Sequence, residues 1–236
     1  MTYDEERYGV ICGVIGFAIG FAVAVILCGT GHAGEFYLSG SGGVTSFIRT
    51  VEDGTWVQEG LPHHFHSQNL GWRTGAGYRI NPAWSVQAHY VNLGTVRLET
   101  LAVDDRHYDA KAHRCLSHCD HAIPFHTHDL MEGVELSLSR HWQIGAVEPF
   151  LRAGGAAMYH RLTAQFAGVT LYGQDGKAFK GWIPTVLVGG GLCHRWVCGE
   201  TTYYYGFGGG TDWSAGLPIS KQAVQTLLTV NVPLHW

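Results

Sequence analysis

The chain has 236 residues, of which 46% are hydrophobic and only 14% are charged, and its formal net charge is −4. Soluble domains usually carry about 25% charged residues, so this composition argues against an ordinary soluble domain. The negative net charge also excludes the basic surface that binds nucleic acid. With 33 glycines and 12% aromatic residues, the composition favours many strands and tight turns.

The first predicted element is an uncharged apolar run over residues 10–28, followed by small residues before position 34. This pattern is typical of an export signal, so we expect residues 1–33 to be a signal peptide and residues 34–236 to form the exported domain. The segment before the run is acidic, which is unusual for a secretory signal. The run is also long enough to be an uncleaved membrane anchor, and this alternative stays open.

From residue 34 onward, apolar and polar residues alternate in repeated short segments, as they do in strands with two different faces. Eight strands are predicted, at residues 34–47, 70–80, 84–92, 133–139, 147–159, 182–192, 197–207 and 227–236. The connections between them alternate in length. Short ones lie near residues 81–83, 140–146 and 193–198, and long ones cover 48–67, 95–130, 166–181 and 208–220.

This arrangement predicts an all-β fold, an eight-stranded antiparallel up-and-down transmembrane β-barrel over residues 34–236. The apolar faces are too hydrophobic to be exposed to water. In lipid, only a helix or a closed sheet satisfies the hydrogen bonding of every backbone group. Trp84, Trp142 and Trp196 each lie at a short turn, where tryptophan rings gather at a membrane boundary. The alternative is a soluble lipocalin-like barrel with its apolar residues inside.

Two stretches resemble a known family. LGWRTGAGYRINPAWSVQAHYVNLG, residues 70–94, resembles the second and third strands of the OmpA-like small outer-membrane barrel family. The terminal LLTVNVPLHW resembles the signal that the outer-membrane assembly machinery recognises in its clients. Its alternating apolar residues and final aromatic are Leu228, Val230, Val232, Leu234 and Trp236.

The resemblance implies a location in the outer membrane of a Gram-negative bacterium. It also implies contact with outer-membrane lipids, lipopolysaccharide and the assembly machinery, without the peptidoglycan-binding domain of larger relatives. Members of the family often have structural, adhesive or host-contact roles. We therefore expect a structural or surface-interaction role carried by long extracellular loops, with a host or surface ligand as partner.

Several charged residues fall on the inward faces of the predicted strands. Because the interior of an eight-stranded barrel is just wide enough to be filled by side chains, we expect these charges to pair with one another. A narrow gated pore is the alternative reading. The expected interior ion network comprises Arg73, Arg79, His89, Glu135, Glu148, Arg152 and Glu200.

Histidines and cysteines gather in the first two long connections, and imidazole and thiolate are ligands for Zn²⁺ or copper. Apart from such an ion, no cofactor is expected. The alternatives are a solvated loop without a ligand and a Cys115–Cys119 disulfide. A metal site here would weaken below about pH 6 as imidazoles become protonated. The candidate ligands are His63, His64, His66, His113, Cys115, His118, Cys119, His121, His126 and His128.

Cys193 and Cys198 flank the predicted short turn at residues 194–197. Facing strand ends bring their Cβ atoms close together, so we expect a disulfide across this turn. A metal pair is the alternative.

Catalysis is not expected, because no serine shows a recognisable spacing to histidine and acid partners. Adjacent pairs such as His66 and Ser67 point to opposite faces of a strand. A triad assembled from distant strands is not excluded by this argument. The alternative functions are a surface metal-binding protein and a lipid A-modifying hydrolase.

Overall fold

The computed structural model describes residues 34–48, 63–102, 108–109, 114–115, 123–166, 169–170, 179–207 and 222–234. The expected signal segment 1–33 and the terminal Trp236 lie outside these ranges. Within them, no helix has the length and hydropathy needed to cross a membrane.

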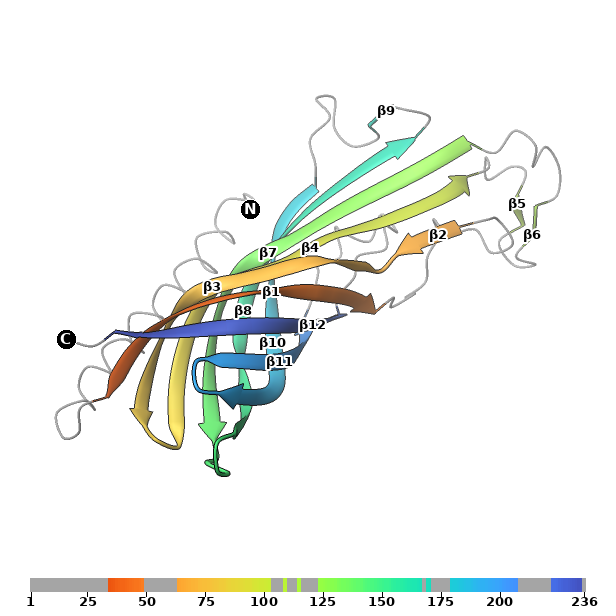
Figure 1. Ribbon diagram of the computed structural model, residues 1–236. Coiled ribbons are helices and arrows are strands. Elements are labelled where there is room, and N and C mark those ends of the chain that lie inside the picture. The colour runs from red at the N-terminus through yellow and green to blue at the C-terminus, as the bar shows by residue number, and fades with distance from the viewer. Residues whose placement is uncertain are drawn as a thin grey trace, which may run out of the picture.

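Eight long strands form a closed antiparallel wall, which confirms the predicted fold class (Figure 1). Around the barrel their order is β1-β3-β4-β7-β8-β10-β11-β12, and the pairing of β12 with β1 closes the ring. The strands are β1 (Glu35–Ile48), β3 (Gln68–Asn81), β4 (Trp84–Ala102), β7 (Ile123–His141), β8 (Glu148–Phe166), β10 (Phe179–His194), β11 (Val197–Gly206) and β12 (Gln222–Leu234).

The short connections β3–β4, β7–β8 and β10–β11 lie together at one end of the barrel, which we call the short-turn end. At the opposite, long-loop end, β4, β7 and β8 project beyond the other strands (Figure 1). Four short strands lie there: β2 (His63–His66), β5 (Tyr108–Asp109), β6 (Arg114–Cys115) and β9 (Val169–Thr170).

The predicted loop at residues 95–130 is partly wrong, because its two ends are strand. Residues 95–102 continue β4, and residues 123–130 begin β7. The cause is a bulge between Asn92 and Gly94, where the register with β7 shifts by one residue. Gly94 has φ +89° and donates its N–H to Asn92 Oδ1 at 2.8 Å. One extra residue exchanges the two faces of a strand, so the alternation read from the sequence stops here.

The two faces of the wall have the polarity expected in lipid. Arg152 is 1% exposed inside the barrel, whereas Leu228 is 62% exposed outside. A soluble barrel would show the reverse, so the lipocalin-like alternative is wrong. Outward apolar side chains on six of the strands include Leu38, Val44, Leu70, Val134, Leu138, Leu151, Val186, Val188, Leu192, Leu228, Val230 and Val232.

Aromatic side chains mark both edges of this apolar band. Trp84, Trp142 and Trp196 are exposed at the short turns, as predicted. Towards the long-loop end, Trp72 packs against Tyr90 and Tyr159 against Trp182, with ring centroids 5.5 and 5.2 Å apart. Two aromatic girdles flanking an apolar band are typical of transmembrane β-barrels.

Candidate functional site

The centre of the barrel holds a four-membered ion network. Arg73 on β3 contacts Glu135 on β7 at 3.3 Å and also pairs with Glu200 on β11. Arg152 on β8 contacts the same two carboxylates, at 2.5 and 3.2 Å. Side-chain exposure of all four residues is at most 3%. Each charge thus faces two of opposite sign, which offsets the cost of burial.

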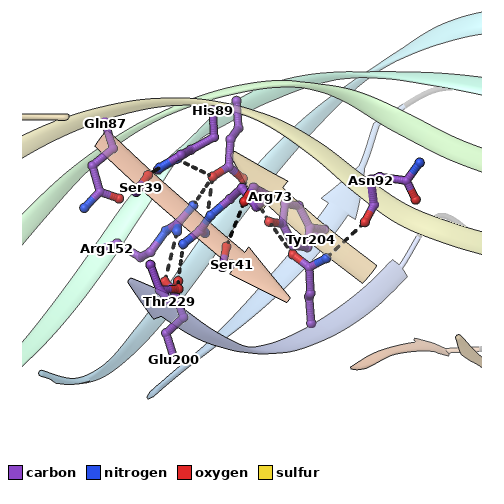
Figure 2. A network of polar contacts seen from close by, with 12 residues as sticks. Ser39, Ser41, Arg73, Gln87, His89, Asn92, Arg152, Glu200, Tyr204 and Thr229 are labelled. Carbon is purple, nitrogen blue, oxygen red and sulfur yellow. Dashed lines mark hydrogen bonds and ion pairs between the residues drawn. The ribbon is translucent and has the colours of Figure 1, made fainter. Parts of the chain in front are cut away.

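Further polar groups complete this central network (Figure 2). Tyr204 donates its hydroxyl to Glu135 Oε2 at 2.9 Å, and Thr229 donates to Glu200. His89 Nδ1 lies 3.1 Å from Glu135 Oε1, while its Nε2 lies 2.6 Å from Ser39 Oγ. The sequence analysis placed His89 here but missed Tyr204. The aromatic row of β11 lies on the outward face, and on the opposite face, where Tyr204 lies, only charged residues were considered.

A second polar group lies at the short-turn end. Glu148 pairs with Arg79 and accepts a hydrogen bond from Gln143. His141 Nδ1 lies 2.7 Å from Glu148 Oε1, an ion-pair contact whose direction falls outside hydrogen-bond geometry. His141 Nε2 lies 2.8 Å from Ser85 Oγ. The seven predicted network residues are therefore inside the barrel, divided between this group and the central one.

A cavity of about 430 Å³, lined by both polar and apolar side chains, lies between the two groups and the short-turn end. Its lining includes residues of both polar groups, and Arg73 and Glu200 form its inner boundary. Exposed residues of the short turns, Gln143, Ala146 and Arg195, also line it. The cavity therefore reaches the water at the short-turn end.

The long-loop half of the interior is richer in apolar side chains. Buried side chains from several strands pack there into one cluster, and nearby Asp129 forms a buried pair with His160 at 3.2 Å. The cluster comprises Phe47, Val91, Leu93, Val96, Met131, Met158, Leu187, Tyr204 and Ala223. Together with the central network, it fills the described interior between the cavity and the long-loop end.

Cys193 and Cys198 form a disulfide between directly opposed positions of β10 and β11. Both side chains are buried and pack with Phe150 at the cavity wall. The bond joins the two strands beside the turn at Arg195, whose φ of 57° places it in the left-handed region.

The candidate metal ligands fall in different places. His113, His118, Cys119 and His121 lie outside the described residues, and Cys115 lies on β6. The remaining five were expected in loops but belong to strands: His63, His64 and His66 to β2, and His126 and His128 to β7. Among the described side chains, no group of three or more His, Cys, Asp or Glu could hold a metal ion.

Backbone pairing nevertheless brings these strand histidines near one another. His64 on β2 is opposite Glu99 on β4, which is opposite His126 on β7. The adjacent row runs from His66 through Arg97 to His128. Residues opposite one another in an antiparallel ladder share a face of the sheet, so the two rows form one block at the long-loop end.

Four of the five predicted assembly-signal residues lie on β12, and the fifth, Trp236, lies outside the described residues. Leu228, Val230 and Val232 are exposed on the outward face, and Leu234 is half-buried. Their apolar stripe is therefore part of the outer band of the barrel.

Fold, polarity and filled interior together define a small transmembrane β-barrel, the class that occurs in bacterial outer membranes. No family model matches the chain, and no curated protein matches it in sequence.

Several solved structures are similar in fold. Neisserial surface protein A is 13% identical with a TM-score of 0.44, and the match covers 85% of this chain and 99% of that one. Ail, the attachment invasion locus protein of Yersinia pestis, solved with the heparin analogue sucrose octasulfate, is 12% identical with a TM-score of 0.42, covering 86% and 100%. The outer membrane protein OprG from Pseudomonas aeruginosa is 13% identical with a TM-score of 0.41, covering 86% and 97%. Similarity at this level assigns no function to the chain.

Proposed function

We propose that this chain is an outer-membrane barrel protein of a Gram-negative bacterium with a structural or surface-interaction role. Its short-turn end would then face the periplasm and its long-loop end the outside, as in other barrels of this class. Outer-membrane lipids and lipopolysaccharide would surround the apolar band, and a host or surface ligand would bind the long-loop end.

The observation that carries this proposal is the filled interior. The central network and the apolar cluster occupy the described core of the barrel, and this argues against a channel. The binding surface for a partner would therefore lie on the outside of the barrel. β4, β7 and β8 project furthest there (Figure 1), so a ligand would meet these strands and their connections first.

The test is adherence of bacteria to cultured epithelial cells. Expression of the intact chain should increase adherence, and replacing residues 103–122 with a short glycine-containing turn should abolish the increase. In a matched control, residues 143–146 at the short-turn end are replaced by an equally short turn, which should leave adherence unchanged. Surface amounts would be equalised by antibody labelling. Adherence that is unaffected by the 103–122 replacement would contradict the proposal.

A second candidate function is metal binding at the long-loop end. The row of His64, Glu99 and His126 within this block supports it, because imidazole and carboxylate are common Zn²⁺ ligands and imidazole also binds copper. Neighbouring strands are about 4.8 Å apart, so the backbones of β2 and β7 are about 10 Å apart across β4.

Isothermal titration of the folded protein with Zn²⁺ and with Cu²⁺ tests this candidate. Stoichiometric binding is expected, with a loss of at least 10-fold in affinity for the double variant His64→Ala/His126→Ala. His194→Ala at the short-turn end, where His194 contacts the Ala146 carbonyl, is the control and should bind as the parent does. Absence of binding by the parent would overturn the candidate.

A further inference from the structure

The short-turn end of the barrel combines three side chains in the order used by serine hydrolases. Ser85 Oγ is 2.8 Å from His141 Nε2, and His141 Nδ1 is 2.7 Å from Glu148 Oε1. Catalytic triads are recognised by this geometry and not by their order along the chain. These residues come from β4, β7 and β8, so sequence spacing could not reveal the arrangement.

We propose that Ser85, His141 and Glu148 form a hydrolytic centre for small O-acyl esters that enter the cavity from the short-turn end. All three line the 430 Å³ cavity. The Nδ1 contact of His141 is poorly directed, and catalytic hydrogen bonds often align only when substrate is bound. Stacking on Phe150, with ring centroids 5.6 Å apart, limits the movement of the imidazole.

A second Ser–His–Glu set in the same barrel provides an internal comparison. Ser39, His89 and Glu135 show similar distances, 2.6 and 3.1 Å. Ser39 does not line the cavity, however, and Glu135 is already shared by Arg73 and Arg152. The central set therefore has the contacts of a triad without access for a substrate, whereas the set at the short-turn end has both.

The reaction follows from the positions of the three side chains. Ser85 Oγ attacks the ester carbonyl carbon, and its proton passes to His141 Nε2. Glu148 stabilises the imidazolium, and Tyr37 and Arg79, which line the same cavity, are the donors available for the oxyanion. The C–O bond then breaks, and the alcohol leaves with the proton from His141. Water adds to the acyl-serine in the same way, releasing the carboxylic acid and restoring Ser85.

The cavity lining indicates the class of substrate. Charged and polar side chains from the short turns and from both polar groups line much of the cavity, and the apolar cluster lies beyond the central network. Phe150, Trp196 and Pro233 add apolar surface to the lining. A long acyl chain would nevertheless be stopped at the charged inner boundary formed by Arg73 and Glu200. Short acyl groups, such as acetyl, carried on a small polar alcohol fit this volume and polarity. The proposed substrates are therefore water-soluble and not membrane lipids, which distinguishes this activity from lipid A hydrolysis.

The first test is covalent labelling of the folded full-length protein in detergent micelles with a small fluorophosphonate, which reacts with activated serines. Peptide mass spectrometry should locate one adduct on Ser85, and boiling before labelling should abolish it. Because this measurement uses the unaltered chain, it does not depend on the folding of any variant. An unlabelled Ser85 in folded protein would overturn the proposal.

The second test is hydrolysis of p-nitrophenyl acetate. Ser85→Ala and His141→Gln should each lower kcat by about 100-fold or more, with the folded fraction measured by gel mobility of unboiled samples. Ser39→Ala is the matched control, since it removes the equivalent hydroxyl from the central set, and its rate should equal that of the parent. A parental rate in Ser85→Ala would contradict the proposal. Neither test involves the long-loop end, so the outcome is independent of adherence and metal binding.

Discussion

Glu135 is the most connected side chain of the interior. It pairs with Arg73 and Arg152, accepts from Tyr204 and lies beside His89. Removing one partner from a buried ion pair is costly because the remaining charges cannot return to water. The two arginines depend on this carboxylate, since Glu200 is their only other ion-pair partner among the described residues.

We therefore expect Glu135→Gln to lower the free energy of unfolding by about 3–5 kcal/mol. Urea unfolding in micelles, followed by tryptophan fluorescence, measures this change. Glu148→Gln is the matched control, because the Glu148 side chain is 15% exposed and water can replace part of its interaction with Arg79. Its loss should be clearly smaller, and equal losses would contradict the role assigned to the central network.

Alternation along the strands was enough to place these charged residues inside the barrel. The partners could not be read from the sequence, because they depend on the register of strands that are distant in the chain. Arg73 and Glu200, for example, are 127 positions apart. Ser85 was likewise on a predicted inward face, but its contact with His141 depends on the pairing of β4 with β7.

At the scale of the strands, inward glycines allow the wall to curve tightly. A Cβ at Gly133 on β7 would lie 2.1 Å from the carbonyl oxygen of Ala157 on β8. This neighbour is backbone, so no change of rotamer can relieve the overlap. At Gly42, on the outward face of β1, a Cβ would meet no atom within 4 Å.

We predict that Gly133→Ala reduces the yield of folded barrel severely, whereas Gly42→Ala folds as the parent does. The measurement is the fraction of unboiled protein that migrates as the compact form on a gel after refolding into micelles. Normal folding of Gly133→Ala would show that β7 and β8 can separate without loss of the ring.

The disulfide acts on a single hairpin. Because the covalent loop between Cys193 and Cys198 is short, the bond removes little entropy from the unfolded chain. Replacing both cysteines with alanine should lower the free energy of unfolding by about 2 kcal/mol, as measured by urea titration under oxidising conditions. Addition of dithiothreitol should destabilise the parent by a similar amount and leave the double variant unchanged. A larger effect of the reductant on the variant would contradict this assignment.

The presence of each long strand could be predicted from the sequence, but its length could not. The polarity pattern located all the long strands, because each has one face in lipid and one in the interior. It ended early on β4, where the bulge at Gly94 exchanges the faces, and on β7, where half of residues 123–132 are polar and do not alternate regularly with the apolar ones. The histidines of β2 and β7 were assigned to loops because the polarity pattern did not extend to them.

At the scale of the whole molecule, two linked predictions follow from the closed ring and the filled interior. Unboiled protein in micelles should migrate differently from boiled protein, since a closed barrel resists unfolding by detergent. In planar lipid bilayers the same preparation should give no stable conductance, because the central network and the apolar cluster occupy the described interior. A porin reconstituted in parallel serves as the positive control, and reproducible single-channel steps from this chain would contradict a filled barrel.

The ring is closed by β1 and β12, the first and last strands of the wall, which pair continuously from Phe36 with Leu234 to Ile48 with Gln222. Because β12 also pairs with β11, a sheet that lacked β12 would expose unpaired hydrogen-bonding groups along both β1 and β11. Such edges readily pair with other chains. Before ring closure this protein would therefore be most prone to aggregate, and a chaperone that shields these two strands would protect it most.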